Sequence, residues 1–192
     1  MAAISSSKDI LMLLLYAKGA SDKECEPIEG KTRLMKMVFL FDKELRRSVN
    51  LRKTIPSTAL PQFEAYSYGP YSAQVYRDLE FLVELGLIDV TSLDNVEKLP
   101  EEIREYEYWQ ATNDTDEDNT GQSQELFSLS DLGRKFVENK LLPTLSDSHK
   151  EAINEFKRRC TAASLRSLLK YVYSKYPRMT DRSKIRDKVM EP

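Results

Sequence analysis

The chain has 192 residues, of which 41% are hydrophobic and 31% are charged, and its formal net charge is −2. This size and composition predict one globular domain, or one core with a helical appendage, that can bury a real apolar core. The two cysteines, Cys25 and Cys160, stand far apart and indicate neither a disulfide framework nor a thiolate metal site. We therefore expect a cytoplasmic protein.

The small net charge hides three regions of opposite sign. Basic residues dominate from 31 to 53, acidic residues dominate from 78 to 125, and basic residues return from 157 to 188. Such an uneven distribution of charge can steer a charged partner toward one part of the molecule.

The first predicted element is a helix over the apolar run 10–16. Ser6 and Asp9 stand at the spacing of a helix start, and Gly19 provides a stop. The run is too short to cross a membrane, which needs roughly 18 uninterrupted apolar residues. Charged residues follow it, and no cleavage site of small residues does, so it predicts a buried helix and not a signal peptide. We expect no contact with a membrane.

A second helix is predicted to open at Gly30. Its apolar positions recur at spacings of three and four residues, which predicts one buried stripe: Leu34, Met37, Val38, Phe41 and Leu45. The same periodicity predicts that Lys36, Lys43 and Arg47 point toward water and form a basic face.

Residues 63–68 alternate large apolar side chains with smaller or polar ones, which predicts a short strand or an extended loop before Gly69 and Pro70. Ser72 can cap a third helix, and Gly86 ends it. The apolar positions of this helix again share one face: Val75, Leu79, Leu82 and Val83. A strand over residues 87–90 follows directly.

The segment after that strand is acidic and typical of a loop. Between residues 94 and 125 the sequence predicts a long insertion with one strand at 106–111. Residues 126–129 predict a returning strand, and residues 130–137 begin another helix. Two more helices are predicted beyond it, one with a capping box at Ser148 and Glu151, and a last one whose apolar side includes Leu165, Leu168, Leu169, Val172, Tyr173 and Tyr176.

This order of elements is that of a winged helix. The predicted fold class is mainly α with a small β part (α+β): a winged helix-turn-helix core with a long acidic wing insertion and extra C-terminal helices. We expect a winged-helix domain over residues 1–143, with the insertion near 94–125, and a C-terminal helical extension over 144–192 packed on it. Residues 75–88 resemble the recognition helix and first wing strand of many winged-helix regulators.

A narrower resemblance rests on two motifs. Residues 30–40 are Gly-Lys-Thr-Arg-Leu-Met-Lys-Met-Val-Phe-Leu, and residues 68–72 are Tyr-Gly-Pro-Tyr-Ser. With the Gly-Leu-Ile element at 86–88, they resemble the YwgA-like proteins and, more distantly, the Panacea or SocA-like antitoxin domain. The resemblance implies a non-enzymatic module: antitoxin-like members bind and neutralise or deliver a protein partner, whereas other winged helices bind DNA.

The candidate partner-binding residues come from the tyrosine cluster at 66–71 and from the basic face of the second helix. The aromatic rings around Gly69 and Pro70 have either a structural role, as a wedge between strand and helices, or a role as a binding hot spot. Tyr68 and Tyr71 are the candidates for the second role. Lys36, Lys43 and Arg47 are candidates for gripping an acidic protein surface or nucleic acid, or they balance the acidic insertion within the same molecule. A homodimer is left open.

DNA binding is the alternative, as expected of a transcriptional regulator. Gln74 and Arg77 near the start of the third helix would then enter a major groove, and Arg33 of the second helix would contact the nucleic acid as well. The acidic insertion would repel phosphate groups, and so would the carboxylates of the third helix: Asp78, Glu80 and Glu84. A protein partner is therefore favoured.

The sequence contains no arrangement of residues that is typical of catalysis. The single histidine, His149, stands at the start of a predicted helix, and Cys25 lies between two glutamates that are expected to raise the pKa of its thiol. The acidic run at 114–118 lacks the spacing and the central glycine of an EF-hand. We expect no catalytic residue, no metal site and no cofactor.

Overall fold

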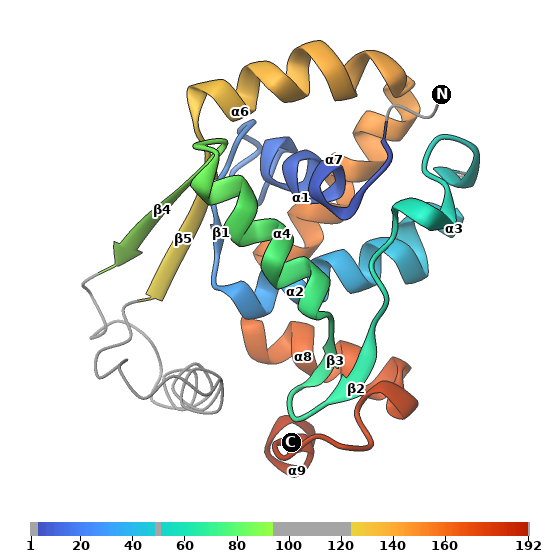
Figure 1. Ribbon diagram of the computed structural model, residues 1–192. Helices are drawn as coiled ribbons and strands as arrows, with labels where there is room; N and C mark the ends of the chain where they lie inside the picture. Colours follow the sequence, from blue (N-terminus) through green and yellow to red (C-terminus); the bar gives the residue numbers. More distant parts are fainter. Residues whose placement is uncertain (1–3, 49–50, 94–123, 192) are drawn as a thin grey trace.

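The structure is a computed structural model that describes residues 4–48, 51–93 and 124–191. These residues are mainly helical and include two small antiparallel sheets (Figure 1). The predicted α+β composition is therefore observed. The predicted acidic insertion lies outside the described residues, apart from its last two positions, and the predicted strand at 106–111 lies outside them entirely.

The first helix, α1 (Ser7–Tyr16), is buried along its apolar run. It begins as predicted, because the Asp9 carboxylate accepts the backbone N–H groups of Ser5 and Ser6 at 2.9 and 3.0 Å. Residues 10–15 are all buried because other elements pack against α1 on several sides. A helix that is apolar all round belongs in the interior of a protein.

Two further helices complete the centre of the molecule. Helix α2 (Lys31–Leu40) continues through a π-helical turn (Phe41–Leu45) into the short helix α3 (Arg46–Ser48). Helix α4 (Ala73–Glu84) follows Ser72 and ends before Gly86, whose φ of +68° closes the helix as the sequence predicts. Both α2 and α4 pack against α1.

A three-stranded antiparallel sheet lies beside these helices. Its strands are β1 (Ile28–Glu29), β4 (Ile88–Leu93) and β5 (Gln124–Leu129), in the order β1-β5-β4. The register places Ile28 and Val90 opposite Phe127 on either side of the central strand. The two-residue strand β1 was not predicted, since two residues carry no periodic pattern.

A short strand does form within residues 63–68, as one of the two predicted alternatives, and it is the first strand of a hairpin. Strand β2 (Glu64–Tyr66) pairs with β3 (Gly69–Tyr71), and Tyr66 faces Gly69. The φ of Gly69 is +85°, a conformation that favours glycine. Gly69 and Pro70 thus begin a second strand, which the sequence analysis does not predict.

The chain after β5 forms α6 (Asp131–Phe136), a π-helical turn (Val137–Leu141), α7 (Asp147–Ala162), α8 (Leu165–Lys175) and α9 (Arg186–Met190). Helix α7 begins earlier than predicted, because its cap is Ser146, whose Oγ accepts the N–H of His149 at 3.2 Å. Helix α8 packs on both α2 and α9. Single 3₁₀ turns link the elements: Leu51–Lys53, Ser57–Ala59, Leu142–Thr144 and Pro177–Met179. Among the helices described here, none is long and apolar enough to cross a bilayer.

Candidate functional site

The prediction that Lys36 faces water is wrong. Its side chain is 2% exposed, and its ammonium group donates hydrogen bonds to the carbonyl oxygens of Tyr68 and Pro70 at 2.8 and 2.9 Å. The hairpin packs over the side of α2 that periodicity assigns to solvent, so the polar face of the helix is covered. Burial lowers the pKa of Lys36 to about 7, because the ammonium form loses its hydration.

The other basic candidates of the second helix differ in exposure. Lys43 is half-buried and pairs with Asp42 at 3.0 Å, while Arg47 is exposed. Arg33, a candidate for contact with nucleic acid, donates from Nη1 to the carbonyl oxygens of Cys160 and Ala163 at 2.6 and 2.8 Å. It therefore caps the C-terminal end of α7 and fastens α7 to α2. These residues do not form one continuous basic face.

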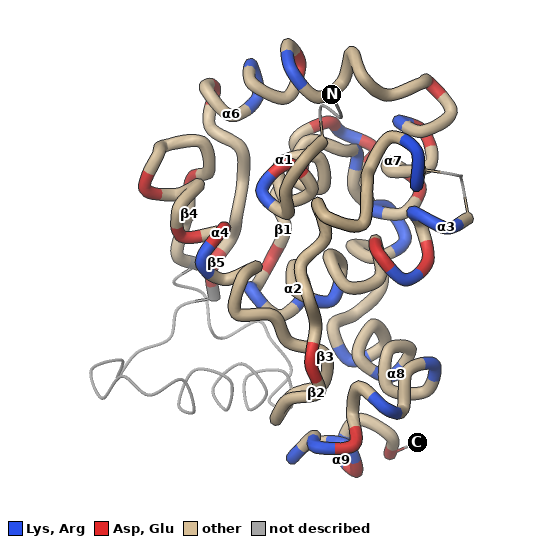
Figure 2. The backbone as a smooth tube through the Cα atoms, turned by 45° about the vertical axis from the view of Figure 1, so that its right-hand side comes forward, with Lys and Arg blue, Asp and Glu red and all other residues tan. Residues whose placement is uncertain are grey.

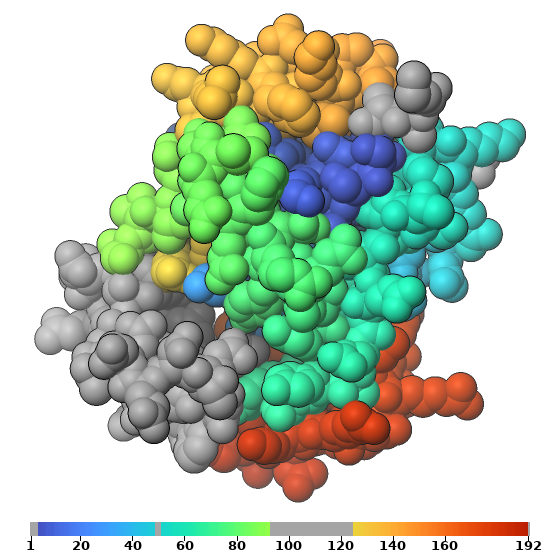
Figure 3. Space-filling view, in the orientation of Figure 1, coloured from blue at the N-terminus to red at the C-terminus, as the bar shows by residue number. Residues whose placement is uncertain are grey.

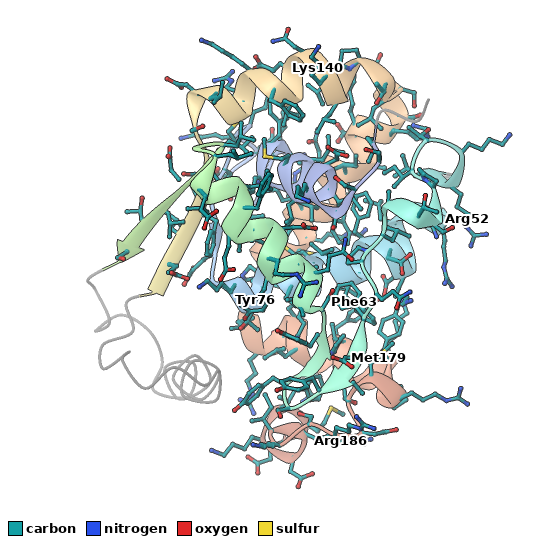
Figure 4. All side chains as sticks on the ribbon, viewed as in Figure 1. Arg52, Phe63, Tyr76, Lys140, Met179 and Arg186 are labelled. Atoms are coloured by element: carbon teal, nitrogen blue, oxygen red, sulfur yellow. The ribbon has the colours of Figure 1, made fainter. Side chains whose placement is uncertain are left out.

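The two candidate tyrosines have different surroundings. Tyr68 is 7% exposed and belongs to the core, which favours the structural role for this residue. Tyr71 is half-buried, and its ring lies between two others, stacked on Tyr66 at 4.9 Å and tilted toward Tyr76 at 5.5 Å between ring centroids. Figure 4 shows Tyr76 near the start of α4, beside the hairpin. Three tyrosines thus form what we call the aromatic wall at the surface: Tyr66, Tyr71 and Tyr76.

Helix α4 offers little to a phosphate backbone. Arg77 is exposed, and Gln74 donates to the Oγ of Ser7 at 3.1 Å. Asp78, expected among the repelling carboxylates, is instead buried, where it accepts from Ser7 and pairs with Lys8 at 2.8 Å. The exposed charges that remain on α4 are one arginine and two glutamates, Glu80 and Glu84. Figure 2 shows basic and acidic positions near one another along this helix.

The outer side of α4 carries apolar side chains that the sequence analysis did not single out. Phe81 is 44% exposed and Leu85 is 52% exposed, and in α6 Leu132 and Phe136 are 58% and 37% exposed. We call these four residues the apolar corner. Each pair has the spacing i, i+4, which places its two members on one side of a helix. The helical periodicity did not point to them, because they lie outside the apolar stripe that each helix buries in the core.

The two halves of the apolar corner are held together by the chain between them. The Ser130 hydroxyl donates to the Gly86 carbonyl at 2.6 Å, and the Ser130 N–H donates to the Leu87 carbonyl at 3.1 Å. A Cβ at Gly133 would lie 2.0 Å from the Leu87 oxygen, so the first turn of α6 packs directly on the backbone that links α4 to β4. Figure 3 shows α4 open to the surface beside the segment that contains α6.

A second buried lysine, Lys157, was also missed. Its side chain is fully buried, and its ammonium group donates to the carbonyl oxygens of Leu15, Ala17 and Glu26. Burial lowers the pKa of Lys157 to about 7, while the nearby Glu26 opposes that shift. A signal existed in the sequence, because Lys157 falls on the buried stripe of α7 formed by Ile153, Phe156 and Cys160.

The cysteines lie in sites that suppress the thiolate form. Burial raises the pKa of the Cys160 thiol to about 12, and burial is also the main cause of the raised pKa of Cys25, with Glu24 a smaller one. Within residues 4–48, 51–93 and 124–191, no three His, Cys, Asp or Glu side chains converge in a way that could hold a metal ion. Comparisons of the chain with family models, curated proteins and solved structures found no match.

Proposed function

We propose that this chain is a non-catalytic winged-helix protein that binds a protein partner through the apolar corner, in the manner of an antitoxin or an adaptor. The winged-helix part of the proposal is supported by the topology. Three helices pack together, a short strand lies between the first two, and the sheet order is β1-β5-β4. In this arrangement α4 is the recognition helix, and β4 and β5 are the strands of the wing.

The observation that carries the functional proposal is the apolar corner itself. Large apolar side chains that gather at the surface, with charged residues around them, are typical of protein interaction sites. Here they lie on the recognition helix and on α6, whose first turn packs against the link that follows that helix. The exposed glutamates Glu80 and Glu84 suit a partner that presents an apolar ridge flanked by Lys or Arg.

The resemblance to YwgA-like and antitoxin-like proteins agrees with this proposal, since their antitoxin-like members bind proteins. The free thiols of Cys25 and Cys160 suit a reducing compartment, which supports the cytoplasmic location that we propose. The partner is either a different protein or a second copy of this chain, and sedimentation of the purified chain distinguishes the two.

The test is affinity purification of the tagged chain from cells of its source, with and without nuclease treatment. The variant Phe81→Ser/Leu85→Ser is compared with Met190→Ser, whose side chain is 41% exposed but lies on α9. We expect a stoichiometric partner whose co-purification does not change on nuclease treatment. Met190→Ser should retain this partner, and the double variant should retain at least tenfold less of it. Truncating a hot-spot side chain costs 2 kcal/mol or more of binding, which is about thirtyfold in affinity.

DNA binding stays as the second proposal because Arg77 is exposed on the recognition helix. It predicts that nuclease releases what the chain retains, and that Arg77→Glu abolishes the retention while Phe81→Ser/Leu85→Ser does not. A protein partner retained equally by all variants would contradict the assignment of the apolar corner.

A further inference from the structure

A cleft opens between α2, the β2–β3 hairpin, the start of α4 and the segment before α9. Its volume is about 110 Å³, and it is lined by Thr32, Met35, Lys36, Tyr66, Ser67, Tyr68, Gly69, Tyr71, Tyr76 and Lys184. An engineered cavity of about 150 Å³ holds one benzene molecule. The cleft therefore accepts a group about the size of one side chain.

Lys36 supplies a buried cation to this cleft. Its ammonium group has three N–H donors, of which two are directed at the carbonyl oxygens of Tyr68 and Pro70. Within the described part of the chain, no carboxylate lies within 4.0 Å of it. A buried charge without a counter-charge is costly, so an anion that reaches Lys36 would gain more than it would at an exposed lysine.

The walls of the cleft are suited to the stem of a ligand. Tyr66 and Tyr71 stack with their ring planes at 30°, and Tyr66 is 44% exposed at the outer edge. Lys184 lines the cleft on the other side, where its backbone N–H donates to the Ser67 carbonyl at 2.9 Å. The site combines a cation at its buried end with aromatic surface toward the outside.

We propose that this cleft binds a carboxylate group on a short stem, with one carboxylate oxygen accepting the third N–H of Lys36 and the stem lying against Tyr66 and Tyr71. A single ammonium donor matches a monoanion, whereas a phosphate group is usually held by several donors at once. The carboxylate belongs either to a free small acid or to an acidic side chain of a peptide. This site is separate from the apolar corner, so neither proposal depends on the other.

The binding depends on pH through Lys36. The groups that line the cleft beside it are Tyr66, Tyr68 and Tyr71 of the hairpin, Tyr76 of α4 and Lys184 near α9, and none of them is a carboxylate. Because burial places the pKa of Lys36 at about 7, its ammonium form is lost above that pH. The affinity for a carboxylate should fall about tenfold for each pH unit above 7 until the neutral amine alone remains.

The experiment is an NMR titration of the full chain labelled with ¹³C at the lysine ε-carbons. The probes are glutarate, as a free acid, and N-acetylglutamate amide, as a peptide-borne side chain. Glutaramide and N-acetylglutamine amide are the neutral controls. At pH 6 we expect the Lys36 signal to shift with a dissociation constant on the order of 1 mM for at least one acid. The tighter acid identifies the source of the carboxylate.

Lys157 serves as an internal control, because it is buried to a similar degree and has a similarly lowered pKa but does not line the cleft. Bound acid should raise the pKa of Lys36 and leave Lys157 unchanged. Equal shifts with the neutral amides, equal affinity at pH 6 and pH 9, or a shift of Lys157 in place of Lys36 would each overturn the proposal.

A pair of surface variants tests the aromatic wall without disturbing the core. Tyr66→Ala should weaken the binding at least fivefold, because it removes the outer ring of the stack. Tyr171→Ala, whose ring is 42% exposed on α8, should leave the affinity unchanged. Equal affinity in the wild type and Tyr66→Ala would show that the acid does not occupy this cleft.

Discussion

Lys36 and Lys157 are both buried, and both donate hydrogen bonds to backbone carbonyl oxygens, but their surroundings differ. Lys157 donates to three carbonyl oxygens, two of which, Leu15 and Ala17, lie at the C-terminal end of α1. A cation there is stabilised by the helix dipole as well as by the hydrogen bonds. Lys36 donates to only two carbonyl oxygens, one in the turn and one in the second strand of a hairpin, and it lines a cleft.

The difference lies in how fully each charge is satisfied. Every N–H of Lys157 has an acceptor, and Glu26 contributes a favourable charge nearby. Lys36 has a third donor without an acceptor in the described residues, and desolvation is the only cause of its lowered pKa. A buried lysine whose N–H donors all have acceptors serves to hold the structure together. One that has a donor without an acceptor at a cleft can also bind a ligand.

Replacing each lysine by methionine should give the largest effect on stability. Lys157→Met leaves three buried carbonyl oxygens without a donor, and Lys36→Met leaves two. At 1–3 kcal/mol for each buried group left unpaired, less the desolvation that the charge no longer costs, we expect losses of about 4 and about 3 kcal/mol. Urea unfolding at pH 7 measures both.

Lys135→Met is the matched control, because Lys135 is exposed on α6. Its effect should stay within about 0.5 kcal/mol. A larger loss in Lys36→Met than in Lys157→Met would contradict the view that Lys157 is the more fully satisfied of the two lysines.

The sequence predicted those elements whose own residues determine them. Helix α1 has a paired start signal and an unbroken apolar run, and α4 has a regular apolar stripe closed by Gly86, so both were predicted nearly to their ends. Lys36 was misplaced because its burial comes from a hairpin about thirty residues further along the chain. A helical period shows which side faces the core, but it does not show what covers the opposite side.

The apolar corner and the cleft also differ in whether a local sequence pattern could predict them. Phe81 and Leu85 form an apolar pair at i, i+4 that lies off the core stripe of α4, and this pattern could have been found in the sequence. The cleft could not, because its lining residues come from four segments spread between Thr32 and Lys184. Their proximity depends on tertiary packing, which no local pattern reports.

Gly69→Ala tests how the turn clamped by Lys36 is held from its other side. A Cβ at Gly69 would lie 2.9 Å from Cε2 of the Tyr173 ring, and the residue has a φ of +85°. The strained backbone and the crowded ring should together lower the free energy of unfolding by about 2 kcal/mol. Thermal and urea unfolding measure the loss.

Gly86→Ala is the control for the backbone alone. Gly86 also has a positive φ, +68°, but nothing lies within 4 Å of an added Cβ. We expect a loss of about 1 kcal/mol there. If both variants lost the same amount, the close contact between the Tyr173 ring and Gly69 would add nothing to the cost of the strained backbone.

The stability of the chain should also depend on pH, and both buried lysines contribute to that dependence. Each has a folded pKa of about 7 and an ordinary value of 10.5, so between these values the unfolded chain binds more protons than the folded one. Stability therefore rises with pH, by up to about 1.4 kcal/mol per pH unit for each lysine, and this gain is lost again as the pH falls to 7.

Below pH 7 the lysines are protonated in both the folded and the unfolded chain, so their contribution no longer changes with pH. Above pH 9 the buried Cys160 thiol, with its pKa raised to about 12, acts in the opposite direction, so the useful range is pH 7 to 8.5. Urea unfolding across that range should show the rise in the wild type and about half of it in Lys36→Met and in Lys157→Met.

Saturating the cleft with acid should reduce the slope of unfolding free energy against pH in the wild type and in Lys157→Met, since a bound carboxylate restores the proton to Lys36. The slope of Lys36→Met should not respond, and a response there would place the acid elsewhere on the protein.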